Sequence, residues 1–226
     1  MKKSIKRITA AISAAVVCAL PTVNAITSSA AKATQKNTYK IETIMHGGSD
    51  RVYFLHIDRY FNSAIKNSVT LRNSSFQLPC NSFSAKMPQQ GRMVFSAESS
   101  ALRRYDGVVS IDTFDVPASV TPAQFKWNFY ATATGNYYLG DGTLYTEYED
   151  SMEERVHLVG DANGDGVIMM NDVVVIQQYL INVLDEDEID LIAADANGDG
   201  TVDENDGELI QRYLLGSISS FADYQF

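Results

Sequence analysis

The sequence predicts a two-module protein, an all-β sandwich followed by a small all-α module. Three observations predict it. Short alternating apolar runs, broken by turn residues, give way to helical spacing after residue 159. Residues 26–159 contain 13 basic and 13 acidic side chains, whereas residues 160–216 contain 14 acidic and one basic. Finally, one acidic, glycine-rich stretch occurs twice near the C-terminus, as GDANGDGVIMMND and ADANGDGTVDEND.

The N-terminal residues 1–25 have the features of a secretory signal peptide. A basic start, MKKSIKR, precedes a short apolar run, and Val23-Asn24-Ala25 provides small residues for cleavage. Because no second apolar segment long enough to span a bilayer follows, we expect a secreted chain whose mature form has no membrane span. Residues 26–38 are small and polar, and we expect a disordered spacer there.

Residues 39–149 read as the β-sandwich module. Strand-like runs include RVYFLHI, SVTLRNSSF, GRMVFSA, DGVVSIDTF and QFKWNFYATAT. In the last of these, alternation places Trp127 on the apolar side with Phe125 and Phe129, so we expect it in the core and not on a sugar-stacking surface. The charged residues 150–158 are expected to be a linker.

The duplicated stretch has the oxygen-ligand spacing of a calcium loop. Counting from the first aspartate of each copy, side-chain oxygens occupy positions 1, 3, 5 and 12, a glycine at position 6 permits a sharp turn, and position 7 offers a carbonyl. Zinc would favour Cys or His, which both loops lack. The sequence therefore predicts two Ca²⁺ sites with these ligands: Asp161, Asn163, Asp165, Val167 and Asp172 in the first, and Asp195, Asn197, Asp199, Thr201, Asp203 and Asp206 in the second.

The repeat extends beyond the loops, since residues 161–181 and 195–215 share 12 of 21 positions. Each loop opens an amphipathic helix, but a β-like segment and not a helix precedes the first loop, so the unit is a loop with one helix, a half EF-hand. Residues 159–216 closely resemble the type I dockerin, the docking module of cellulosomes. The resemblance implies calcium-dependent binding to a cohesin module of a scaffold protein. Residues 217–226 are expected to be a C-terminal tail.

The resemblance also implies which residues contact the cohesin, through loop positions 10 and 11 and helix positions 17 and 18. These are Met170, Asn171, Gln177 and Gln178 in the first repeat, and Glu204, Asn205, Gln211 and Arg212 in the second. The first set is neutral and lies beside Met169, whereas the second is charged. We therefore expect the two faces to bind unequally, with the methionine-bearing face as the anchor.

The function of the sandwich stays open at this level. Residues 106–114, following residues 94–97, resemble part of a cohesin sandwich, which implies an adaptor that binds another dockerin. A carbohydrate-binding module that binds polysaccharide is the rival interpretation. Carboxylates for a small glycoside hydrolase are present, but no spacing selects a pair, so we favour a non-catalytic role. The acidity argues against nucleic acid, and the resemblance implies an extracellular component of a polysaccharide-degrading system.

Overall fold

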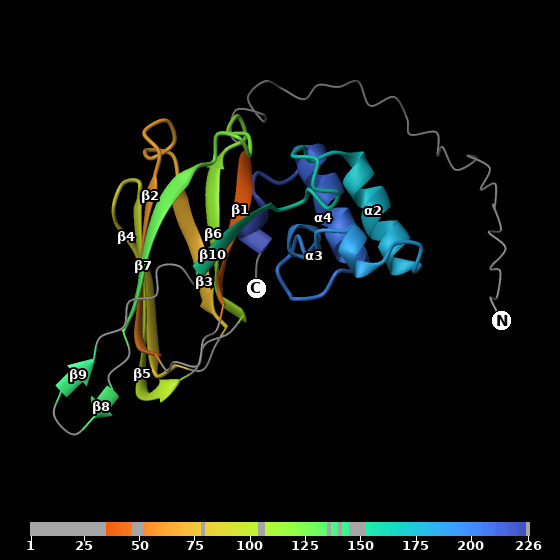
Figure 1. Ribbon diagram of the computed structural model, residues 1–226. Helices are drawn as coiled ribbons and strands as arrows, with labels where there is room; N and C mark the ends of the chain where they lie inside the picture. The colour runs from red at the N-terminus through yellow and green to blue at the C-terminus, as the bar shows by residue number, and fades with distance from the viewer. Residues whose placement is uncertain are drawn as a thin grey trace, which may run out of the picture.

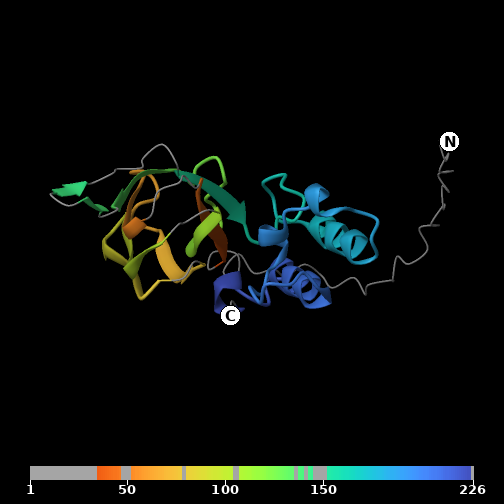
Figure 2. The same ribbon diagram turned by 60° about the horizontal axis from the view of Figure 1, so that its bottom comes forward.

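The computed structural model describes residues 35–46, 52–77, 80–103, 107–134, 137–139, 142–144 and 152–224. The expected signal peptide and residues 26–34 of the expected spacer lie outside this part. A β-rich body and a helical body lie side by side in Figure 1 and end to end in Figure 2. Among the described residues, no helix is long and apolar enough to cross a membrane.

The described strands confirm an all-β N-terminal region, built from two antiparallel four-stranded sheets. The first sheet has the order β10 (Met152–Leu158), β1 (Lys36–Met45), β6 (Gly107–Pro117) and β3 (Thr70–Phe76). The second has the order β4 (Ser82–Gln89), β5 (Arg92–Arg103), β2 (Val52–Phe61) and β7 (Trp127–Thr134). A separate two-stranded ribbon pairs β8 (Tyr137–Leu139) with β9 (Gly142–Leu144).

The two sheets share one hydrophobic core, as the alternating runs predict. Tyr39 of β1 stacks on Phe125 with ring centroids 4.2 Å apart, which joins the first sheet to the segment entering β7. Trp127 packs against the same cluster and donates its indole N–H to Glu154, so the expectation that it belongs to the core is confirmed.

A fully buried arginine ties the two sheets together inside this core. Arg59 lies on β2 of the second sheet, and its guanidinium donates to Asp112 on β6 at 2.6 Å and to Glu154 on β10 at 2.5 Å. It also donates to Thr43 on β1 at 2.6 Å. Because two carboxylates surround one guanidinium, the buried charges compensate one another and connect β2 to three strands of the opposite sheet.

Two boundaries predicted from the sequence are wrong. Residues 152–158, expected to be a linker, form strand β10, which pairs with β1 and closes the edge of the first sheet. The β-like segment expected before the first loop is thus a strand of the sandwich. Its charged composition hid that membership, because Glu154 faces Arg59 inside the sandwich and not solvent. The expected spacer also extends too far, since β1 begins at Lys36 and its first residues pair with β6.

The C-terminal module has helices within residues 170–214, as expected. They are α2 (Met170–Leu180), the short η2 (Glu186–Glu188), the single-turn α3 (Leu191–Ala194) and α4 (Glu204–Leu214). Helices α2 and α4 pack on each other around a second core that includes Val173, Ile176 and Ile210. This core is separate from that of the sandwich, although Ile168 packs against both.

The expected tail is part of the folded body. Its helix η3 (Phe221–Tyr224) buries Phe221, which stacks on Tyr213 of α4 with centroids 4.6 Å apart. Ser220 donates to Asp115 of β6 and lies 3.2 Å from the hydroxyl of Thr38. The tail therefore fills the junction between the modules.

Replacing Arg59 with Ala should lower the free energy of unfolding by about 3–5 kcal/mol, because Asp112 and Glu154 would remain buried without a cation. Arg92→Ala is the matched control, since Arg92 pairs with Asp58 at the surface and its loss should cost about 1 kcal/mol or less. Urea unfolding of both variants measures the difference. Equal losses would contradict the assignment of Arg59 as the central cross-link.

Candidate functional site

The first acidic loop, residues 161–172, folds around its own backbone amides. Asp161 accepts from the N–H groups of Asp165 and Gly166 at 3.1 and 2.8 Å. Asp172 reaches back from the first turn of α2 and accepts from Asn163 and Met169 at 3.2 and 2.7 Å. Positions 1 and 12 therefore close the loop from its two ends.

The second loop, residues 195–206, repeats this arrangement residue by residue. Asp195 accepts from Asp199 and Gly200 at 3.1 and 3.2 Å, and Asp206 accepts from Asn197 and Asp203 at 3.1 and 2.8 Å. The glycines at positions 4 and 6 of both loops have φ between +70° and +88°, a backbone conformation that favours glycine. The sequence duplication is thus also a duplication of backbone form.

Three of the four carboxylates that close the loops, Asp161, Asp172 and Asp206, are buried. Burial raises the pKa of Asp161 to about 6, and the nearby charges of Asp172 and Asp165 add to the rise, while the Gly166 N–H opposes it. Burial likewise raises the pKa of Asp172 and of Asp206. Since burying a carboxylate without a counter-charge is unfavourable, both loops hold negative charge that a cation would stabilise.

The residues of both loops fit a hard cation. Carboxylate, amide and carbonyl oxygens are the ligands that Ca²⁺ prefers. Within the described residues, however, no three acidic, His or Cys side chains form a group ready to hold a metal. Asp165 and Asp199 each accept from the backbone N–H of position 7 and from the side chain of the asparagine at position 3. Binding of an ion by these carboxylates would therefore require them to give up hydrogen bonds.

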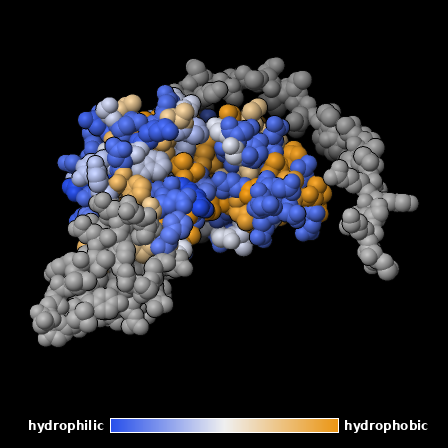
Figure 3. Space-filling view, in the orientation of Figure 1, coloured by the Kyte–Doolittle hydropathy of each residue, from blue (hydrophilic) through white to orange (hydrophobic). Residues whose placement is uncertain are grey.

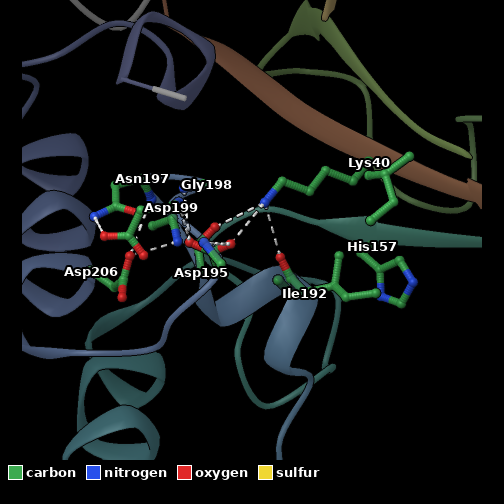
Figure 4. A network of polar contacts seen from close by, with 12 residues as sticks. Lys40, His157, Ile192, Asp195, Asn197, Gly198, Asp199 and Asp206 are labelled. Atoms are coloured by element: carbon green, nitrogen blue, oxygen red, sulfur yellow. Dashed lines mark hydrogen bonds and ion pairs between the residues drawn. The ribbon is translucent and has the colours of Figure 1, made fainter. Parts of the chain in front are cut away.

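The second loop lies against the outer face of the first sheet (Figure 4). Lys40, on this face of β1, donates to the carbonyl oxygens of Ile192 and Asp195 at 3.4 and 3.0 Å. Its ammonium also lies 3.8 Å from a carboxylate oxygen of Asp195. Burial lowers the pKa of Lys40, and the charges of Asp195, Asp206 and Asp190 oppose this.

A histidine of the same sheet holds the other end of α3. His157, paired with Lys40 across β10 and β1, lies with Nδ1 2.7 Å from a carboxylate oxygen of Asp190. Asp190 in turn accepts from the N–H groups of Ile192 and Ala193 and caps α3. The sandwich therefore fixes both ends of the short helix that leads into the second loop.

The surroundings of His157, which is partly buried, favour its protonated form. Burial alone would lower its pKa, but the hydrogen bond to Asp190 and the negative charges of Asp190 and Glu42 raise the pKa to about 9. The ring's Nε2 lies 3.8 Å from Glu42, too far for a hydrogen bond, and has no partner among the described residues. The effect of Glu42 is therefore one of charge.

The expected cohesin contacts lie along α2 and α4. Met170, Asn171 and Gln177 are exposed on α2, and Glu204 and Asn205 are exposed at the start of α4. Gln178, Gln211 and Arg212 are partly buried. A groove of about 520 Å³ runs between the helices, lined by Ile176, Gln177, Leu180, Glu204 and Gln211 among others. The structure thus gathers residues of both repeats around one groove.

The two repeats differ at this surface. Met169, Met170 and Val174 of the first repeat are about half exposed, and Figure 3 shows hydrophobic residues gathered on the helical module. In the second repeat Arg212 lies over the ring of Tyr224, 5.2 Å from its centroid, and its guanidinium is 3.3 Å from the hydroxyl. Tyr224 of the C-terminal tail therefore already contacts Arg212, one of the residues expected to bind the cohesin.

The sequence did not predict that Lys40 and His157, which lie outside the duplicated repeats, contact the second loop and the helix before it. Lys40 and His157 lie at single positions in strands, and no local pattern marks a contact more than 30 residues away. The only signal was the charge of residues 160–216, which carry 14 acidic side chains and one basic side chain and so call for cations from elsewhere. Pairing of β1 with β10 was needed to place two such cations side by side.

Stability should fall with rising pH in a window set by His157. Its folded pKa, about 9, lies above its ordinary value of 6.5, so its contribution is fully present below pH 6.5 and is lost as the pH rises through about 9. The contribution is at most about 3 kcal/mol. Urea unfolding at fixed calcium between pH 6 and 10 measures it in the wild type and in His157→Gln, which should lack this decline.

His46→Gln is the control for that series, because His46 is an exposed imidazole that directly follows β1 and lies beside Glu153 of β10. It should retain the wild-type profile. A decline of the same size in His157→Gln would contradict the role of the His157–Asp190 contact.

Comparison with known proteins covers the second module. No curated protein and no solved structure matches the chain. Residues 159–215 match the family model of the dockerin type I domain. These residues span both loops, α2, α3 and α4. Residues 159–215 are therefore a type I dockerin domain, a kind of module that binds calcium and docks onto cohesins in cellulosome-type assemblies.

Proposed function

We propose that this protein is a secreted cellulosome component that binds two Ca²⁺ and docks onto a cohesin of a scaffold protein. The observation that supports it best is the matched pair of loops, each closed by buried carboxylates and each opening a helix. The non-catalytic β-sandwich is the module that this dockerin carries within a polysaccharide-degrading system.

The duplicated half EF-hand accounts for the stoichiometry of two ions. The first would be held by Asp161, Asn163, Asp165, the carbonyl of Val167 and Asp172, and the second by the equivalent residues from Asp195 to Asp206. Asp203 offers a further oxygen at position 9, where Met169 offers none, although Asp203 here caps α4 through the N–H of Asn205 at 2.7 Å. When bound, each ion supplies positive charge where the carboxylates are buried, so metal binding is coupled to folding.

Calcium should raise the stability of the wild type and bind with a stoichiometry of two. Asp172→Asn should leave one site and Asp172→Asn with Asp206→Asn should leave none, because position 12 supplies the carboxylate that closes each loop. In the wild type, calcium at about 100 times Kd stabilises the fold by about 2.7 kcal/mol per site. Calorimetric titration and thermal melting in calcium and in chelator measure both quantities.

A matched control removes two acidic charges from the same module away from the loops. Glu186 and Asp187 are exposed on η2, so Glu186→Gln with Asp187→Asn should retain two sites. Equal melting temperatures of the wild type in calcium and in chelator would overturn the calcium proposal.

The first repeat is proposed as the main cohesin-docking face. Its exposed apolar residues Met170 and Val174 correspond to Glu204 and Glu208 in the second repeat, where apolar contact is lost. Arg212, held by Tyr224, must also give up that contact before it can bind a partner. Apolar side chains with adaptable shape provide the binding energy, and the second repeat supplies a polar margin.

Met170→Glu with Val174→Glu gives the first repeat the acids of the second and should weaken cohesin binding by about 100-fold or more, equivalent to about 2.7 kcal/mol. Glu204→Gln with Glu208→Gln is the control and should change affinity by less than about threefold. Calorimetry against a panel of cohesins, with calcium present, measures both. A larger loss in the control variant would assign docking to the second repeat.

A further inference from the structure

The two loops share the hydrogen bonds of their position-1 and position-12 carboxylates described above, but they have different surroundings. The first meets the sandwich through apolar contacts, where Gly166 lies against Pro122 and a cavity of about 350 Å³ lies between the modules. Among the described residues, no Lys, Arg or His forms an ion pair with a carboxylate of this loop. The second loop receives the ammonium of Lys40 beside Asp195, its position-1 carboxylate.

Lys40 is buried, and hydrogen bonds hold its ammonium beside the second loop. It is only 5 % exposed, and its side chain extends from β1 across the junction to the end of α3 (Figure 4). Two carbonyl oxygens of the C-terminal module accept hydrogen bonds from it, so the ammonium keeps polar partners in the interior. The charge therefore stays near the second loop and is not free to move into solvent.

We propose that Lys40 is an affinity-determining residue, which makes the second calcium loop weaker than the first and links its occupancy to the β-sandwich. This inference rests on the proposed binding of two calcium ions. Before the metal binds, the ammonium offsets part of the negative charge of Asp195. After binding, it faces a divalent cation on the same carboxylate, and this repulsion opposes binding.

Lys40 could instead act only by holding the loop in shape, but other contacts already do so. Asp190 caps α3 and is held by His157, and its N–H donates to the carbonyl of Ala162 at 3.0 Å. Gly160 donates to the carbonyl of Ala193 at 2.8 Å. These bonds remain when Lys40 is removed, whereas no other described residue supplies a positive charge at Asp195. Lys40 therefore differs from these other contacts in the positive charge that it brings to Asp195.

The test is a calcium titration of the full chain by calorimetry, with Lys40→Met and Lys40→Gln compared with the wild type. Both variants should bind one of the two ions about tenfold more tightly and leave the other unchanged, because a single and a double charge a few ångströms apart interact by at least this amount even in water. The affected step is assigned to the second loop by its loss in Asp206→Asn. Lys40→Gln keeps a hydrogen-bond donor and serves if Lys40→Met does not fold.

Two controls separate charge from structure. Lys40→Arg keeps the charge and should bind as the wild type does. Lys36→Met removes one charge from the same strand, near Asp115 and away from the loops, and should also leave both affinities unchanged. In chelator, Lys40→Met should melt at a lower temperature than the wild type, since Asp195 loses its counter-charge.

The sign of the change decides the outcome. Tighter calcium binding together with a lower melting temperature in chelator supports the proposal, because a merely structural lysine would weaken both. Unchanged or weaker binding in Lys40→Met and Lys40→Gln overturns it. If the wild type itself binds no calcium, the proposed function fails, which is distinguishable from a failure that concerns Lys40 alone.

Discussion

Buried carboxylates are the constraint on which the C-terminal module depends. Asp161, Asp172 and Asp206 lie in the interior, each held by backbone N–H groups of its own loop. Such bonds fix the shape of a loop but do not neutralise its charge, which is why burial raises the pKa of all three. Around 57 residues can form only a small core, so a module of this size gains from any further source of stability, and the proposed cations would be one.

The β-sandwich supplies positive charge to the acidic C-terminal module. The outer face of its first sheet presents Lys40 and His157 to α3. The inner face of the same sheet carries Asp112 and Glu154, which pair with Arg59 of the second sheet. Strand β10 takes part in both, because Glu154 points inward while His157 points toward the helical module. Strand β10, which joins the modules in sequence, thus also joins them through charge. Polar groups of each module find their partners in the other module, and these contacts hold the two cores next to each other.

The sequence predicted what depends on local pattern. Loop spacing, the glycines of each loop, the helices after them and the inward position of Trp127 follow from period and turn chemistry. A β-like segment was expected before the first loop, but the pairing of β10 into the sandwich escaped prediction. Its inward residue Glu154 is a charge whose partner, Arg59, is 95 residues away. The C-terminal segment escaped for a similar reason, since Ser220 and Phe221 gain their contacts from β6 and α4. Long-range pairing of charged or small polar residues leaves no periodic signal, and only the fold reveals it.

The asymmetry of the repeats follows from what each one faces. Twelve identities in 21 positions give the repeats the same internal form, yet the second has acids at Glu204 and Glu208, an arginine held by Tyr224 and a lysine at its loop. The first has exposed methionines and no cation from the described residues at its carboxylates. Each of these differences acts in the same direction. They favour the proposed binding of an ion and a partner by the first repeat, while the second repeat makes polar contacts with the sandwich and the tail. The contacts that attach the module to the sandwich thus differ in kind between the repeats, since the second loop meets Lys40 whereas the first meets apolar residues such as Pro122.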